Sequence, residues 1–517
     1  MRKTLLAAVF VTTSIWPQDS ATIRVNTRLV EVDVVVHSKG KPVDNLRAAD
    51  FSLFDEGKPQ RIAAFAIRRD SNVPPVLPLA PGEISNRPNR LSSEPVAPTI
   101  ILLDTLNSDP EDMFEARRHV AMYLERATPG APIAIYALNR TLTVLHDFTG
   151  DPERLRKIVS RWAAPSSADA SAETLITDLP ATGNTLADGM TQAVAKEMTD
   201  MANLRRAEMT AFALETIAKH LSGLPGRKKL IWAGASFPAR TSEQRSRLGT
   251  KQIETRDYTK YIDSAVRALN EAQVAVYPID PRNPCKPTCL GSPLFHAVGI
   301  DTMNLIAGGT GGRAFYVLND IAGAVQEAFE DSEITYMLGF YPEKTNLDGK
   351  YHDLKVKLVR IDAEVRYRRG YVAAESKPPA PAENQKLLRS AMEAPLEATA
   401  IGVSARFLPE QSQAALREFL LRIDVHELEM KTEQSKDGSP LSTASVTVAT
   451  FFPADPKRAP VVSVVKLTFT ERRLPEVLRE GYLMRFQVDN GGAPGKVRVV
   501  VQDRNSGKAG SLTLDVP

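Results

Sequence analysis

One segment of this 517-residue chain, residues 99–332, alternates short apolar runs with amphipathic stretches. The run TIILLD at Thr99–Asp104 is continuously apolar, which is typical of a parallel strand buried on both faces. The stretch after it opens with Asp109 and Pro110, residues suited to an N-cap and a first helical position. Repeated strand–helix alternation predicts a doubly wound parallel sheet. We therefore expect an α/β domain of this kind over residues 99–332.

On both sides of this domain the hydrophobic period changes to two. Residues 22–70 and 333–375 show short strand patterns, and each piece is too small to bury an adequate core alone. We predict that the two pair with each other, so that the α/β domain is inserted into one split β-sandwich. Residues 385–517 hold seven further strand patterns, which favours an all-β sandwich of immunoglobulin or fibronectin type. The proline-rich segments 71–98 and 376–384 are predicted linkers.

Composition excludes several classes of protein. The chain is 43% hydrophobic and 25% charged, which is ordinary for packed globular domains and unlike a disordered chain. Lys and Arg total 65 against 62 Asp and Glu, a net charge of +3. A dedicated nucleic-acid binder shows a basic domain or stripe, so no nucleic-acid partner is expected. No transmembrane segment is expected in the mature chain.

The N-terminus has the pattern of an export signal. Arg2 and Lys3 precede the apolar stretch Thr4–Trp16, which is of secretory length and too short to span a bilayer. We predict a signal peptide over residues 1–20 and a periplasmic or extracellular location. The following PQDSA is a poor cleavage site, and the alternative is a buried N-terminal helix or strand.

Cys285 and Cys289 lie in the turn-rich segment PRNPCKPTCLGSP. In an oxidising compartment they can close a small disulfide-bonded loop, and we predict this disulfide as a clip on the loop. The alternative is a C-x3-C half-site for a metal, for which His296 is the nearest further ligand.

Ligands of open parallel sheets bind beyond the carboxyl ends of the strands. Here the first such end is the sequence DTLNS, and a TGNTL loop precedes the long helical pattern that follows. These motifs resemble the von Willebrand factor type A (VWA) domain, whose metal-ion-dependent adhesion site uses D-x-S-x-S, a threonine and a later aspartate. Asp104, Ser108 and Thr185 match three of these positions. Leu106 replaces the first serine, and Ala233 stands where the later aspartate is expected.

The resemblance implies a site for Mg²⁺ or Ca²⁺, because carboxylate and hydroxyl oxygens suit hard cations. Two oxygen ligands are missing, so the sequence implies a weak or conditional metal site. The sequence slightly favours the other interpretation, a degenerate and purely structural site in which Asp104 caps the sheet edge and Thr185 caps a helix.

A wider resemblance covers roughly residues 22–373. It is to a VWA-related family abundant in acidobacteria and rests on motifs in the right order. In that family the leucine after the first aspartate looks typical, and the resemblance implies fold and export rather than a defined activity. The motifs are VNTRLVEVDVVVHSKGKPVDNLRAADFSLFDEGKPQRIAAF, LLDTLNS, GRKKLIW, YMLGFYP, DGKYHDLKVKLVR and RRGY.

Catalytic motifs are scarce. The GGTGG run at 308–312 follows a helical pattern and precedes a strand, the reverse of a phosphate-binding loop, and no H-E-x-x-H or G-x-S-x-G occurs. We therefore predict a secreted, non-enzymatic adhesion protein that contacts a protein or cell-envelope partner through the carboxyl-end face of its sheet. One alternative is a metal-independent structural component of an envelope assembly. Another is a metal-dependent hydrolase that uses Asp104, although no His or Glu accompanies it as a general base.

Overall fold

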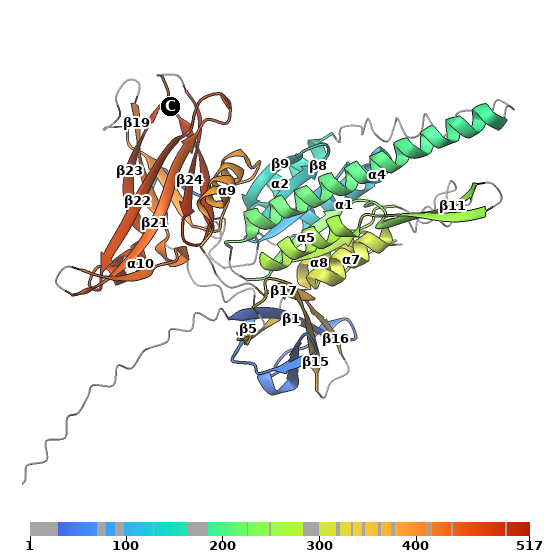
Figure 1. Ribbon diagram of the computed structural model, residues 1–517, viewed down its shortest axis with the longest axis horizontal. Helices are drawn as coiled ribbons and strands as arrows, with labels where there is room; N and C mark the ends of the chain where they lie inside the picture. The colour runs from blue at the N-terminus through green and yellow to red at the C-terminus, as the bar shows by residue number, and fades with distance from the viewer. Residues whose placement is uncertain are drawn as a thin grey trace, which may run out of the picture.

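Three folded units make up the structure, a computed structural model (Figure 1). An α/β domain lies in the middle, one β unit lies below it in this view, and a second β unit lies to its left. None of the helices in the described part of the chain is long and apolar enough to cross a membrane. The described residues are 29–69, 79–87, 98–127, 129–163, 185–224, 226–247, 250–282, 299–316, 321–331, 334–343, 347–359, 363–373, 378–409, 412, 416–435, 438–491 and 494–517.

The α/β domain is built on one five-stranded sheet in the order β13-β10-β7-β8-β9. All neighbours pair in parallel except β8 and β9. A parallel bridge from Ile279 to Phe315 extends the sheet beyond β13, which gives the 3-2-1-4-5-6 order of doubly wound folds. The strands are β7 (Thr99–Asp104), β8 (Ile133–Leu138), β9 (Leu142–Thr149), β10 (Lys228–Ala233) and β13 (Val274–Ile279).

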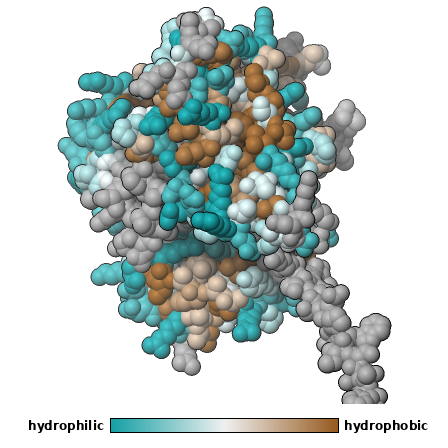
Figure 2. Space-filling model, turned by 90° about the vertical axis from the view of Figure 1, so that its left-hand side faces the viewer, coloured by the Kyte–Doolittle hydropathy of each residue, from teal (hydrophilic) through white to brown (hydrophobic). Residues whose placement is uncertain are grey.

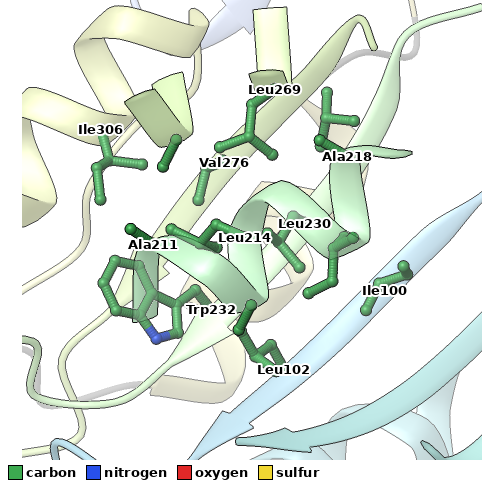
Figure 3. Packing of buried hydrophobic residues seen from close by; sticks show 14 of the residues in the cluster. Ile100, Leu102, Ala211, Leu214, Ala218, Leu230, Trp232, Leu269, Val276 and Ile306 are labelled. Carbon is green, nitrogen blue, oxygen red and sulfur yellow. The ribbon is translucent and has the colours of Figure 1, made fainter. Parts of the chain in front are cut away.

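Helices cover both faces of this sheet, and β7 explains why. Ile100 and Leu102 belong to one core cluster, whereas Ile101 and Leu103 belong to the other, so successive residues are buried on opposite faces. Figure 3 shows the first cluster, where Leu214, Leu269 and Ile306 pack over the sheet. That face carries α4 (Thr185–Leu221), α5 (Thr259–Glu271) and α7 (Ile300–Thr310), and the other carries α1 (Pro110–Arg126), α2 (Pro152–Arg161) and α8 (Ile321–Glu330). The prediction of an α/β domain is confirmed.

Strands from the two short β segments lie in the same sheets. In one sheet β1 pairs with β14 and β16, and in the other β3 pairs with β15. Their inward side chains form one core, to which both segments contribute. The strands are β1 (Val30–Ser38), β2 (Lys41–Pro42), β3 (Phe51–Asp55), β4 (Lys58–Gln60), β5 (Ala64–Arg69), β14 (Ile334–Phe340), β15 (Tyr351–Leu358), β16 (Glu364–Tyr367) and β17 (Gly370–Val372).

The C-terminal unit contains two antiparallel sheets with one core between them. Figure 2 views the molecule from the side where this unit lies in Figure 1, and apolar residues gather at that surface. Val461, Val462, Val464 and Leu483 are exposed large apolar residues of this unit. Its strands are β18 (Val403–Phe407), β19 (Leu416–Ile423), β20 (Lys431–Gln434), β21 (Pro440–Phe451), β22 (Val461–Thr470), β23 (Tyr482–Asp489), β24 (Gly495–Asp503) and β25 (Ala509–Val516).

Two segments predicted as linkers contain regular structure. Within 71–98, β6 (Glu83–Ser85) pairs with β18 and becomes an edge strand of the C-terminal unit. Asn86 fixes it there, because its amide donates to the backbone oxygens of Ala398 and Ile401 at 2.8 and 2.9 Å. The prediction of a continuous linker over 71–98 is therefore wrong at these residues.

The second linker, 376–384, overlaps the start of helix α9 (Pro381–Glu393). Leu388, Ala391 and Met392 of this helix pack against Ala449 and Val500 of the C-terminal unit. A short helix α10 (Leu474–Glu480) also belongs to this unit. The all-β prediction for 385–517 missed both helices.

The end of α4 attaches the C-terminal unit to the α/β domain. His220 Nδ1 donates to the backbone oxygen of Glu397 at 2.5 Å, so in the neutral ring Nε2 accepts from the hydroxyl of Tyr136 at 3.1 Å. Burial lowers the pKa of His220, which favours this neutral ring. Burial also raises the pKa of the Glu397 carboxyl to about 7, and its Oε1 accepts from the backbone N–H of Thr513 at 2.6 Å.

Candidate functional site

The candidate site lies where the strand order of the α/β sheet reverses. β7 pairs with β8 on one side and with β10 on the other, and all three run parallel. Ligands of doubly wound sheets bind at this point, beyond the carboxyl ends of the strands. β7 ends at Asp104 and β10 ends at Ala233, so the DTLNS loop and the Gly234 turn meet here.

The carboxylate of Asp104 is fully buried and accepts four hydrogen bonds. Its Oδ1 accepts from the backbone N–H groups of Leu106 and Asn107 at 3.0 and 3.1 Å. Its Oδ2 accepts from the Asn107 side-chain amide at 2.7 Å and from the Trp232 indole at 2.9 Å. A carboxylate offers about four lone-pair positions. These four donors therefore use the whole accepting capacity of Asp104.

Burial and hydrogen bonding act on Asp104 in opposite directions. Burial raises the pKa of its carboxyl, and the donors from Asn107, Trp232 and Leu106 lower it. The net direction is upward. Because all four partners are N–H groups, the arrangement is complementary to an ionised carboxylate, which only accepts.

Trp232 belongs to the hydrophobic core. It is fully buried, and its ring lies close to Ala211 and Leu102 in Figure 3. A buried indole needs a hydrogen-bond acceptor for its single N–H, and Asp104 supplies it. The core of the domain is thereby connected directly to the loop after β7.

Asn107 connects the same loop to α4. Its side-chain nitrogen donates to the Thr210 hydroxyl at 2.9 Å as well as to Asp104. Thr210 is fully buried on α4. Hydrogen bonds thus join the end of β7 to the neighbouring strand β10 and the loop after it to α4.

Gly234 permits the close approach of β10 to this loop. A Cβ atom at this position would lie 2.6 Å from the Cβ of Asp104 and 3.2 Å from the hydroxyl oxygen of Ser108. The next residue, Ala235, donates its backbone N–H to that hydroxyl at 3.0 Å. Any side chain at position 234 would push the two strand ends apart.

The structure brings together two of the three predicted metal ligands. Asp104 and Ser108 both lie against Gly234. Thr185 is the first residue of α4, and its side chain lies outside the described residues. The predicted disulfide between Cys285 and Cys289, the alternative ligand His296 and the predicted signal peptide also lie outside them.

The described residues do not fit a Mg²⁺ or Ca²⁺ ion. Such ions take six or more oxygen ligands at typical sites, but the Asp104 carboxylate is already saturated by N–H donors. Leu106 is buried in the apolar core, and Ala233 is buried as well. Across the described part of the chain no group of three or more His, Cys, Asp or Glu could hold a metal.

Sequence reasoning missed the two partners that define this site. Asn107 lies within DTLNS, at a position to which the adhesion-site motif assigns no ligand. Trp232 lies in the motif GRKKLIW. A buried indole needs a hydrogen-bond acceptor for its N–H, and this requirement was the signal that could have indicated a polar partner for Trp232. Together they supply to Asp104 the positive partial charges that a cation supplies in a complete adhesion site.

Sequence comparison finds no match, since no family model and no curated protein matches this chain. Among solved structures the chain is similar to a von Willebrand factor type A protein from Catenulispora acidiphila, with 10% identity, 88% of this chain and 72% of that chain covered, and a TM-score of 0.23. It is similar to the vWF domain of the type V pili tip protein Mfa5 from Porphyromonas gingivalis, with 13% identity, coverage of 45% and 93%, and a TM-score of 0.21.

A third structure is the conserved hypothetical protein BatB from Bacteroides thetaiotaomicron, with 11% identity, coverage of 46% and 98%, and a TM-score of 0.24. The strand order of the α/β domain establishes its doubly wound fold independently of these overlaps. Solved von Willebrand factor type A domains are thus among the structures that this chain resembles.

Proposed function

We propose that this chain is an exported binding protein that recognises a protein partner without a metal ion. The α/β domain makes the contact through the carboxyl-end edge of its sheet, and the two β units hold it in position. The closed hydrogen-bond shell around Asp104 carries this proposal. A complete VWA domain binds a cation at this position. In this chain the same position holds Asp104 with its four N–H donors, which we call the anchor.

The anchor determines which chemistry is available at the edge. Asp104 has no exposed surface, so it reaches neither bulk water nor the carboxylate of a ligand. A hydrolase that uses Asp104 needs this group open to metal or substrate, and the geometry therefore disfavours that alternative. Recognition then depends on the shape and charge of the surrounding surface, which set specificity and association rate.

Charged side chains lie beside the anchor at the same edge. Asp109 is exposed at the start of α1 and makes no side-chain capping hydrogen bond. Asp280 follows β13 and is paired with Arg282 at 2.6 Å. Asp109 can therefore be changed at this edge without removing a side-chain cap of α1.

Partner capture tests the proposal. The purified chain is cross-linked to native envelope extract in EDTA and, separately, in Mg²⁺, and captured proteins are identified by mass spectrometry. We expect the same partner in both buffers, reduced capture by Asp109→Arg, and unchanged capture by Asp515→Arg, a matched control on the C-terminal unit whose side chain is 89% exposed. Capture that needs Mg²⁺, or that is equal in both variants, contradicts the proposal.

Calorimetric titration tests metal independence directly. Mg²⁺, Ca²⁺ and Mn²⁺ are titrated into the wild-type chain and into Asp104→Ala. We expect no saturable heat in either protein. Saturable binding to the wild type that disappears in Asp104→Ala would show that the carboxylate exchanges its N–H partners for a cation.

A further inference from the structure

A cluster of four polar side chains joins the split β unit to the α/β domain. The split β unit is the one built from β1–β5 and β14–β17, and in Figure 1 it lies directly below the α/β domain. The cluster combines side chains from both units, and all four are buried or nearly so. We call it the junction cluster: His37 on β1, Arg366 on β16, Tyr277 on β13 and Asp331, which directly follows α8.

Asp331 lies where the chain passes from one unit into the other, because it stands between α8 of the α/β domain and β14 of the split β unit. Its Oδ1 contacts Nη1 of Arg366 at 2.5 Å, and its Oδ2 accepts from the Tyr277 hydroxyl at 2.6 Å. Arg227 of the α/β domain adds a positive charge near Tyr277 and Asp331. The carboxylate of Asp331 therefore ties a strand of each unit to the connection between them.

His37 fits this cluster as a neutral ring. Its Nδ1 lies 3.1 Å from Nη2 of Arg366, and because a guanidinium only donates, this nitrogen accepts and carries no proton. Its Nε2 lies 3.9 Å from Oδ1 of Asp331, which is beyond hydrogen-bond distance. A second proton on the ring would point at an N–H of Arg366. The other charged groups that act on His37 are Glu364, directly opposite it on β16, and Glu327 of α8.

The surroundings of His37 oppose its protonation. Burial lowers the pKa of the ring, Asp331 acts against this shift, and Arg366 adds to it, with a net direction downward. The folded chain therefore binds this proton less readily than the unfolded chain, whose histidine has the ordinary pKa of 6.5. The stabilising contribution of the neutral ring is complete above that pH and is lost as the pH falls through the lowered value.

We propose that His37 is an acid-sensitive switch that loosens the junction between the split β unit and the α/β domain. At neutral pH its ring accepts from Arg366, and the junction cluster is closed. In acid the imidazolium and the guanidinium repel each other, which weakens the contact between Arg366 and Asp331. The attachment of β1 and β16 to the α/β domain weakens with it. The switch is independent of the recognition proposed above for the sheet edge.

Hydrogen exchange of the full chain tests the switch, because one backbone bond reports on the junction. The N–H of Arg369 in the split β unit donates to the backbone oxygen of Gly309 on α7 at 3.0 Å. Exchange is measured by mass spectrometry at about pH 7.5 and about pH 5.5 and corrected for the intrinsic rate. We expect the wild-type amide of Arg369 to lose about threefold or more of its protection at the lower pH.

Two variants separate His37 from other titrating groups. His37→Gln is neutral at both pH values and keeps an oxygen that accepts from Arg366, so we expect it to lose most of the acid response. His426→Gln is the matched control, because His426 lies on the C-terminal unit with its side chain 59% exposed, and it should respond as the wild type does. A wild type without an acid response, or an equal response in His37→Gln, overturns the proposal.

Nuclear magnetic resonance of the histidine rings tests the contact with Arg366 itself. The His37 signal is identified as the one that is missing in His37→Gln, and we expect its titration midpoint below 6.5 in the wild type. Arg366→Gln removes the guanidinium while the burial of the ring remains, so the midpoint should rise and the acid response at Arg369 should shrink. A wild-type midpoint at or above 6.5, or a midpoint unchanged in Arg366→Gln, contradicts the switch.

Discussion

The indole N–H of Trp232 donates to Oδ2 of Asp104 at 2.9 Å, and both side chains are completely buried. The bond joins the ends of two neighbouring parallel strands at the point where the strand order reverses. It places a core tryptophan and a site carboxylate in a single structural unit.

Trp232→Phe removes this donor and leaves a buried carboxylate oxygen with one partner fewer. Hydrogen bonds to charged groups contribute about 1.5–3 kcal/mol, so we expect a loss of that order in the free energy of unfolding, measured in urea. Trp162→Phe is the control, because Trp162 is only partly buried and packs at the border of the other core cluster. Equal losses in the two variants would mean that the bond to Asp104 contributes nothing beyond packing.

Two glycine substitutions should change stability in opposite directions. Gly234→Ala introduces a Cβ 2.6 Å from the Cβ of Asp104, so the strand ends must separate and we expect a loss of about 1–3 kcal/mol. Gly308→Ala lies in α7 with no atom within 4 Å of the added methyl group, and it should gain up to about 1 kcal/mol from helix propensity. Urea unfolding of both measures the difference, and a tolerated Gly234→Ala contradicts the close approach described here.

Glu397 should make stability fall with rising pH. Its pKa is raised from 4.5 to about 7 in the folded chain by burial, so between these values the folded state holds a proton that the unfolded state has lost. Its contribution to stability is therefore present below about pH 4.5 and is lost as the pH rises to about 7.

Glu397→Gln removes this titration and keeps an oxygen for the Thr513 N–H. Relative to wild type, the variant should gain up to about 3 kcal/mol between pH 4.5 and pH 8. His220 makes the opposite contribution, because its lowered pKa stabilises the fold as pH rises. Both proteins contain His220, so its contribution cancels in the difference between their free energies of unfolding. Exposed Glu393→Gln is the control, and parallel pH profiles for Glu397→Gln and wild type would contradict the assignment.

Asn86→Ala tests the attachment of β6 to the C-terminal unit. Asn86 donates to two backbone oxygens and accepts from the Val403 N–H at 2.9 Å, so its loss leaves buried backbone groups unpaired. We expect a cost of about 2–3 kcal/mol and faster proteolysis at residues 79–87. Asn304→Ala, at an exposed position of α7, should change stability by less than about 0.5 kcal/mol. If the two variants are cleaved alike, β6 does not depend on this side chain.

The α/β domain could be predicted because its signal is local. TIILLD is apolar at every position since β7 is buried on both faces, and Asp109 and Pro110 mark the helix start that the structure shows. β6 and α9 were missed because their own sequence patterns are weak or because the patterns of neighbouring segments are stronger. β6 is only three residues long and lies among prolines, and α9 precedes a long series of strands.

The partners of Asp104 could not be predicted for a different reason. Whether Trp232 reaches Asp104 depends on the register between β7 and β10, in which Leu102 is opposite Trp232, and one sequence does not contain that register. The motif match therefore indicated the position of the site but not the hydrogen-bond partners of Asp104. Thr185 as a ligand, the disulfide of Cys285 and Cys289, and export remain predictions.

The pairing of β6 with β18 has a consequence for the order in which this chain folds. The hydrogen bond from Ser85 to Val403 joins residues 318 positions apart, and that from Leu46 to Tyr336 joins residues 290 positions apart. During synthesis the N-terminal strands therefore emerge from the ribosome long before their partners exist. Contacts this distant in sequence form slowly, and exposed strand edges favour aggregation meanwhile. The strands up to Ser85 therefore complete their sheets only after synthesis has passed Tyr336 and Val403.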